Sequence, residues 1–204
     1  MNEQFEHPVY SRNVIEFVAV GREFCRWIET LETGNRKAFA ATALKMLPLL
    51  YLKASILKKV EAEMDDFLET IVTEDEYERI RNCVKLTMGR FDDYLEVFTP
   101  DMRLSEMPLI SAISENIADI YQDIKNFMHN YRTAVTDIMN DALAELINHF
   151  ETYWGQCLVN VLRAIHQAYY YNDDFESEDK EKDDNFDTGK WLIAQRKREW
   201  ENDV

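Results

Sequence analysis

Apolar residues recur every three or four positions over most of this chain, and no other feature restricts its fold as strongly. The pattern is cleanest after Pro108, where it comprises Ile110, Ile113, Ile117, Ile120, Tyr121, Ile124, Phe127 and Tyr131. Residues three and four apart lie on one side of an α-helix, so each such run predicts a helix with one apolar face. Because a single helix of this kind is not stable in water, several must pack their apolar faces together.

Four further segments carry the same spacing and predict helices over about 13–32, 36–57, 73–98 and 138–165. Gly34 and Asn35 predict a tight turn between the first two, and a turn near Thr133 separates the last two. The second helix continues in phase through Pro48. Thr73 and Glu76 form a capping box that opens the third helix, with a break near Gly89. Residues 58–72 lose the periodicity and predict a connection.

The low glycine and proline content agrees with helices rather than with strands joined by tight turns. The chain has 5 glycines and 4 prolines among 204 residues, and strands joined by tight turns need more of both. We therefore predict an all-α fold, in which residues 1–171 form a single helical bundle of about five helices.

The composition changes sharply after residue 171. Residues 172–189 hold nine acids and two lysines, which predicts an acidic flexible linker. Residues 190–204 predict a short amphipathic C-terminal helix that is too short to be stable alone. Tyrosines 169 to 171 cannot all point inward, because adjacent residues on a helix splay by about 100°. The predicted partner-binding residues are Tyr169, Tyr170, Tyr171, Trp191, Leu192 and Trp200.

The net charge of −16 limits the partners that this chain can bind. Such a charge repels phosphate backbones and anionic lipid, so we expect neither direct nucleic-acid binding nor membrane binding. A basic protein partner is compatible with it, and the C-terminal segment could also join two copies. Cys25, Cys83 and Cys157 form no CxxC pair, which predicts buried reduced thiols. With no signal peptide or apolar span, the expected location is the cytoplasm.

Known catalytic motifs are absent, but one alternative remains. There is no HExxH, no Glu-x-x-His, no GxxxxGK[ST] and no GxSxG. Acids step by four along two successive predicted helices: Glu115, Asp119 and Asp123, then Asp137, Asp141 and Glu145, followed by His149.

If the chain reverses near Thr133, Asp123 lies level with Asp141, Asp119 with Glu145, and Glu115 with His149. Glu115, Asp119, Glu145 and His149 could then bind Mg²⁺ or Mn²⁺ in a phosphohydrolase that uses carboxylates on paired helices. The opposing interpretation is a solvated face, because the acids of 115–123 centre roughly 140° from the apolar stripe. Under that interpretation no cofactor is expected.

Five segments in order resemble a bacterial family described only as domain of unknown function 5063. They are NVIEFV (13–18), MLPLLYLKASIL (46–57), DDYLEVF (92–98), ISENIADIYQDIKNF (113–127) and YWGQCLVNVLRAIH (153–166). The resemblance spans roughly residues 10–171, implies a compact all-helical domain, and assigns no catalytic residue. Our leading prediction is a non-catalytic cytoplasmic protein that acts through protein interaction or regulation, with the phosphohydrolase as the alternative.

Overall fold

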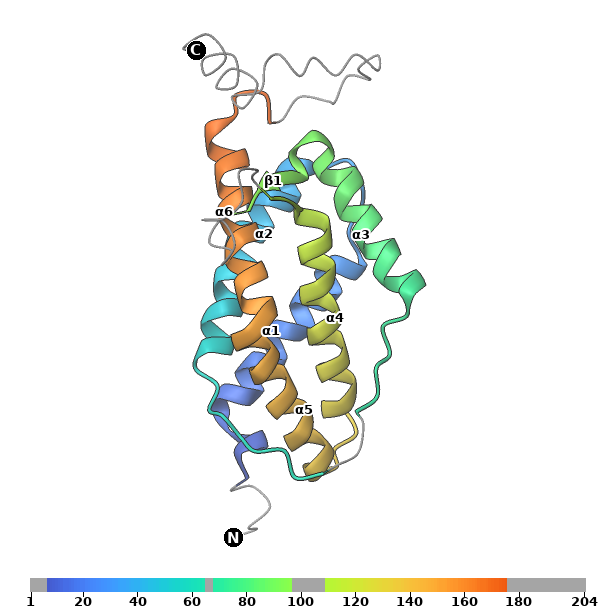
Figure 1. The fold of residues 1–204 in the computed structure, drawn as a ribbon, viewed down its shortest axis with the longest axis vertical. Helices are drawn as coiled ribbons and strands as arrows, with labels where there is room; N and C mark the ends of the chain where they lie inside the picture. The colour runs from blue at the N-terminus through green and yellow to red at the C-terminus, as the bar shows by residue number, and fades with distance from the viewer. Residues whose placement is uncertain (1–6, 65–67, 97–108, 176–204) are drawn as a thin grey trace, which may run out of the picture.

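The computed structural model describes residues 7–64, 68–96 and 109–175, and helices dominate them (Figure 1). The α-helices are α1 Arg12–Glu29, α2 Arg36–Ser55, α3 Glu74–Met88, α4 Ile113–Tyr131, α5 Thr136–His149 and α6 Gly155–Tyr171. A π-helical turn, Phe150–Trp154, joins α5 to α6, so these two form one long rod. The predicted all-α bundle of about five helices is confirmed. Among the described residues, no helix combines the length and apolar character that crossing a membrane requires.

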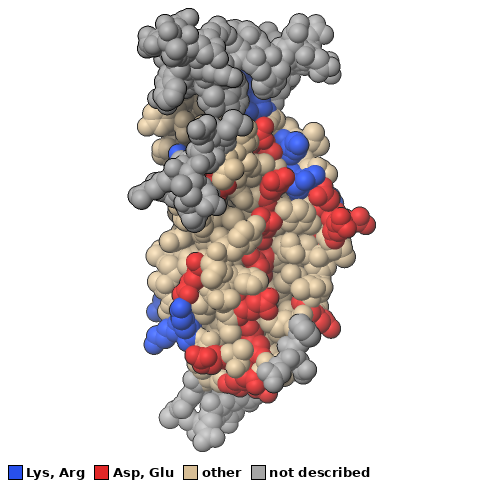
Figure 2. Space-filling model, in the orientation of Figure 1, with Lys and Arg blue, Asp and Glu red and all other residues tan. Residues whose placement is uncertain are grey.

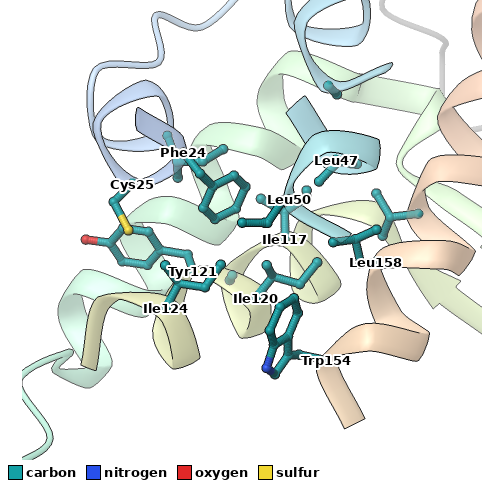
Figure 3. Close-up of a cluster of buried hydrophobic side chains, with 14 of the residues drawn as sticks. Phe24, Cys25, Leu47, Leu50, Ile117, Ile120, Tyr121, Ile124, Trp154 and Leu158 are labelled. Carbon is teal, nitrogen blue, oxygen red and sulfur yellow. The ribbon is translucent and has the colours of Figure 1, made fainter. Parts of the chain in front are cut away.

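Helix α4 lies at the centre of the bundle, where it contacts α1, α3, α5 and α6. Its apolar face is buried as predicted from Ile113 to Phe127, and Tyr121 is buried with it. Figure 3 shows how side chains from α1, α2, α4 and α6 meet around this face. Trp154 is fully buried there, and its indole N–H donates to the carbonyl of Leu146 at 3.3 Å.

Three local signals act as their sequence predicts. Gly34 has a φ of 103°, which favours glycine, in the turn between α1 and α2. The side chain of Asn35 then accepts a hydrogen bond from the Ala38 N–H at 3.0 Å and caps α2. Thr73 accepts from the Glu76 N–H at 3.2 Å and caps α3. The Glu76 carboxylate, however, accepts from the Tyr121 hydroxyl at 2.5 Å. Of the two residues of the predicted capping box, Thr73 therefore acts as the cap.

The end of the third predicted helix and the start of the fourth are wrong. Helix α3 ends at Met88, and residues Asp93–Leu95 form strand β1. Strand β1 pairs antiparallel with β2, Ile110–Ala112, so that α4 begins at Ile113 rather than near 109. Leu95 and Ile110, predicted as helical core residues, are exposed.

Asp92 is the physical reason why α4 begins at Ile113. Its carboxylate accepts from the Ser114 N–H at 2.8 Å and from the Ser114 hydroxyl at 2.6 Å. The backbone carbonyl of Asp92 also accepts from the Ile113 N–H at 2.8 Å. These bonds satisfy donors of the first turn of α4, which no residue of the helix itself can do. Because Asp92 lies far upstream in the sequence, a search for a local cap does not find it.

The connection predicted for residues 58–72 is present, and side chains of α4 and α5 hold its backbone. Buried Asp141 accepts hydrogen bonds from the N–H groups of Glu63 and Met64, at 2.7 and 2.9 Å. Asn126 and Asn130 of α4 accept from N–H groups of residues 69–72. A segment without regular secondary structure can lie against the bundle because these side chains replace a neighbouring strand.

Gly155 makes the π turn sterically feasible. A Cβ atom at this position would overlap both the carbonyl oxygen and the ring of Phe150, five residues earlier. Only glycine allows this close approach without displacing the backbone. The turn adds one residue to the helical path between α5, which packs on α4, and α6, which packs on α2 as well.

Helix α2 continues through Pro48, whose side chain is exposed. Proline within a helix lacks an N–H and clashes with the carbonyl four residues earlier, here that of Leu44. We therefore expect Pro48→Ala to raise the free energy of unfolding by about 1 to 2 kcal/mol, less than the full proline penalty because the native helix has already adapted to the ring. Urea denaturation followed by circular dichroism measures this change.

Lys45→Ala, also on the exposed face of α2, is the matched control, and we expect it to leave the unfolding midpoint unchanged. A less stable Pro48→Ala protein would contradict the expectation, because it would mean that the ring itself sets the path of α2.

Candidate functional site

The C-terminal end of α6 presents a cluster of aromatic rings. Tyr169 is half-buried, whereas Tyr170 and Tyr171 are 62% and 77% exposed. The ring of Tyr169 lies 4.9 Å from that of Tyr170, and the ring of His166 lies 4.7 Å from Tyr170 on the other side. The three tyrosines therefore divide as their helical spacing predicts, with one turned towards the bundle and two towards solvent.

Phe175 fixes the chain where it leaves this cluster. Its side chain is 1% exposed, and its ring lies 5.1 Å from the ring of Phe91 and 5.7 Å from that of Tyr169. The guanidinium of Arg36 stands over the rings of Phe91 and Phe175 and donates to the Phe175 carbonyl at 3.2 Å. Phe175 is therefore held by the cation–π contact and the hydrogen bond from Arg36 and by the rings of Phe91 and Tyr169.

Arg90 adds a second contact to the same stretch. It donates to the Asp174 carboxylate at 2.5 Å and to the Asp174 carbonyl at 3.2 Å. Residues 172–175, predicted as the start of the acidic linker, therefore pack on the bundle. The rest of that linker, 176–189, and the C-terminal segment 190–204 with Trp191, Leu192 and Trp200 lie outside the described residues.

Acidic side chains form a column on the face that α4 and α5 present in Figure 2. Asp119 of α4 accepts hydrogen bonds from the hydroxyls of Tyr77, at 2.8 Å, and Tyr153, at 2.5 Å. Burial and the neighbouring carboxylate raise the pKa of both tyrosines above its ordinary value. Both phenols therefore stay protonated and act as permanent donors that occupy the two oxygens of Asp119.

The other three residues of the metal alternative, Glu115, Glu145 and His149, lie in separate surroundings. Glu115 lies 3.6 Å from the guanidinium of Arg81. His149 Nδ1 lies 3.0 Å from the Asp123 carboxylate, where burial raises the pKa of Asp123. Glu145 borders a cavity of only about 30 Å³ beside these two side chains. Across residues 7–64, 68–96 and 109–175, no three His, Cys, Asp or Glu side chains are grouped so that they could hold a metal ion.

The pairing between α4 and α5 differs from the predicted register. Asp123 meets His149 rather than Asp141, and Asp119 meets Tyr153 rather than Glu145. Both partners lie eight positions further along, about two turns. Side chains lean towards the N-terminus of their own helix, which in an antiparallel pair moves the contact away from the turn by about one position on each helix and accounts for part of this difference.

The cysteines carry no sign of reactivity. Cys25 is buried, and burial raises the pKa of its thiol to about 12. Cys157 is partly buried, contrary to the prediction of full burial, and burial raises the pKa of its thiol to about 11. Cys83, also partly buried, donates to the carbonyl of Leu31 at 3.2 Å. Thiols that stay protonated are poor nucleophiles and poor metal ligands.

The contribution of Phe175 to the free energy of unfolding tests whether the folded bundle extends beyond residue 171. We expect Phe175→Ala to lower the free energy of unfolding by about 3 kcal/mol, because it empties a site enclosed by Phe91, Tyr169 and Arg36. Tyr171→Ala, at an exposed ring, should change it by less than about 0.5 kcal/mol. Chemical denaturation of both variants measures the difference. Equal stabilities would place the end of the folded unit at residue 171, as the sequence predicts.

Comparisons with known proteins identify the family but no activity. No curated protein matches this sequence. Among solved structures, the crystal structure of protein BF1032 from Bacteroides fragilis is 42% identical, with a TM-score of 0.72. The match covers 81% of this chain and 98% of that chain. The model of the family described as Domain of unknown function (DUF5063) matches residues 8–171, so this chain belongs to that family.

Proposed function

We propose that this chain is a non-catalytic cytoplasmic protein that binds another protein through the end of α6 together with the C-terminal segment. The observation that carries the proposal is the exposure of Tyr170 and Tyr171, at 62% and 77%. They lie directly before the part of the chain that extends beyond the family match at residue 171. Two large rings open to solvent at the start of such an extension are the kind of surface that a partner covers.

Tyr169 and Tyr170 already make ring contacts within the chain itself, without a partner. Tyr169 and Phe175 pack on each other, and Phe175 is fixed by Arg36. His166 supports Tyr170 from the preceding helical turn. The packing of Tyr169 and the contact of Tyr170 with His166 reduce the conformational entropy that this surface loses on binding, and tyrosine is enriched at interfaces.

The polar contacts of the bundle support a binding role over a catalytic one. Both oxygens of Asp119 are occupied by tyrosine hydroxyls, and the carboxylate of buried Asp141 holds the backbone of residues 63–64. These two side chains stabilise the fold of the described residues. A general base or nucleophile would instead need an available lone pair directed at a substrate.

The charge of the chain indicates the character of the partner. The net charge is −16, and the acidic column of Figure 2 runs along the face of α4 and α5. A basic protein is therefore the favoured partner, and Trp191, Leu192 and Trp200 would add apolar contacts to it. The same segment could instead join two copies of this chain.

Replacing both exposed rings in the full-length chain, Tyr170→Ser with Tyr171→Ser, tests the proposal. We expect at least a tenfold loss of the co-purifying partner, or of the dimer, because two interfacial tyrosines contribute about 1 kcal/mol or more each. Affinity capture from the native host with quantitative mass spectrometry measures the first, and sedimentation velocity measures the second.

Leu86→Ser is the matched control, since Leu86 of α3 is 71% exposed and belongs to a different surface. If the tyrosine variant and the control retain the same assemblies, or if the wild-type chain is monomeric and captures nothing, the proposed binding surface is wrong.

A further inference from the structure

Helices α1 and α4 enclose a groove of about 590 Å³ whose lining is unusually basic for this chain. Its cationic or titratable basic residues are Arg22, Arg26, Lys125, His129 and Arg132, and Glu29 is its one acid. Val18, Ile71 and Met128 contribute an apolar floor. The whole chain carries 39 acids against 23 lysines and arginines, so this concentration of positive charge calls for an explanation.

Some of these cations already have partners and others do not. Lys125 binds Glu29, and His129 lies 2.7 Å from Glu69. Arg26 is 4.0 Å from Glu23, at the limit of an ion pair. Arg22 and Arg132 are exposed and make no ion pair with any residue in the described ranges. At least two guanidinium groups are therefore available to an anion.

Helix dipoles explain only part of this arrangement. Arg26 lies in the last turn of α1 and Arg132 follows the last residue of α4, where positive charge is favourable. Arg22 and Lys125 lie further inside their helices, beyond the reach of that effect. On α4, the cations centre about 110° away from Glu115, Asp119 and Asp123, so the helix separates its two signs of charge.

The chain contains a segment of matching charge. Residues 176–189 hold seven acids (Glu176, Glu178, Asp179, Glu181, Asp183, Asp184 and Asp187) and two lysines, which gives −7 + 2 = −5. They also contain one ring, that of Phe186. Carboxylates suit exposed guanidinium groups, and a phenyl ring suits an apolar floor.

The segment is long compared with the helices that enclose the groove. It leaves from Phe175, whose carbonyl is bound by Arg36 at the start of α2. Since Gly34 turns the chain back between α1 and α2, the last residue of α1 and the first of α2 are joined by a connection of only six residues. From Glu29, Arg22 lies about 10 Å along α1. Fourteen residues have a root-mean-square span of about 21 Å and a maximum near 46 Å, and this maximum exceeds the length of about 27 Å of α1.

We propose that the acidic segment 176–189 docks in the groove between α1 and α4 of its own chain. Its carboxylates pair with Arg22, Arg26 and Arg132, and Phe186 covers the apolar floor. Tethering gives the segment a millimolar effective concentration, so weak individual contacts suffice. Docking fixes the point on the α1 side of the bundle from which residues 190–204 extend. Raised salt or a competing polyanion releases the docked segment. This inference stands on the groove and its charges and does not require the α6 surface.

Limited proteolysis of the full-length chain tests the contact. A protease that cuts after glutamate cleaves undocked 176–189 at Glu176, Glu178 and Glu181, and cleavage follows the undocked population. We expect Arg22→Glu with Arg132→Glu to accelerate cleavage about tenfold at low salt. High salt should remove the difference, because the Debye length falls from about 30 Å at 0.01 M to about 3 Å at 1 M.

Lys45→Glu with Arg79→Glu is the matched control, since it makes the same change in net charge at exposed positions outside the groove. Asp183→Asn with Asp184→Asn provides a second arm that leaves the bundle unaltered and should also accelerate cleavage. NMR order parameters of the segment amides in the full chain give an independent readout. We expect values above about 0.6 in the wild type at low salt and lower values in the groove variant.

Equal cleavage rates in the groove variant and its control, or equal order parameters in the groove variant and the wild type, would overturn the proposal. Protection that grows with protein concentration would overturn it too, because the segment would then occupy the groove of a second copy. Saturable binding of inorganic tripolyphosphate to the wild type with no protection of the segment would assign the groove to a soluble polyanion instead.

Discussion

Burial of the apolar face of α4 is the interaction on which the rest of the structure depends. Four other helices contact this one, and its isoleucines and Tyr121 occupy the middle of the core. The flanks of the same helix hold two further parts of the fold: Asn126 and Asn130 bind the connection before α3, and Asp119 and Asp123 bind the rod formed by α5 and α6. Because one helix orients so many contacts, the bundle needs neither a disulfide nor a large sheet.

Side chains replace regular secondary structure in several parts of this fold. Asp92 begins α4, Asp141 and the two asparagines of α4 support residues 63–72, and Arg36 secures Phe175. A buried N–H without an acceptor costs about 1 to 3 kcal/mol, so the carboxylates of Asp92 and Asp141 and the amides of the two asparagines stabilise backbone that has no partner in a helix or a sheet. Their burial therefore has a structural explanation that competes with any catalytic interpretation.

The sequence predicts what is local and misses what depends on distant contacts. Helix positions, the turn at Gly34 and the cap at Thr73 follow from neighbouring residues, and so does the prediction that tyrosines 169 to 171 cannot all point inward. The strand pair and the start of α4 depend on Asp92 meeting Ser114 across an intervening segment, which periodicity does not reveal. The sequence places Phe175 in a predicted linker because its neighbours are acids. The aromatic ring itself was the available signal, and its partners Arg36 and Phe91 lie far away in sequence.

The π turn before Gly155 has a consequence for comparing members of this family. A π turn behaves as a one-residue insertion in a helix, so α5 and α6 differ in phase by about 100° from an uninterrupted rod. A family member that lacks one residue between 150 and 154 would present Leu158, Val161 and Ile165 to a different neighbour, although both flanking helices remained intact. A single alignment gap at this position would thus indicate a rearranged core, and a glycine aligned with Gly155 would indicate that the insertion had been inherited.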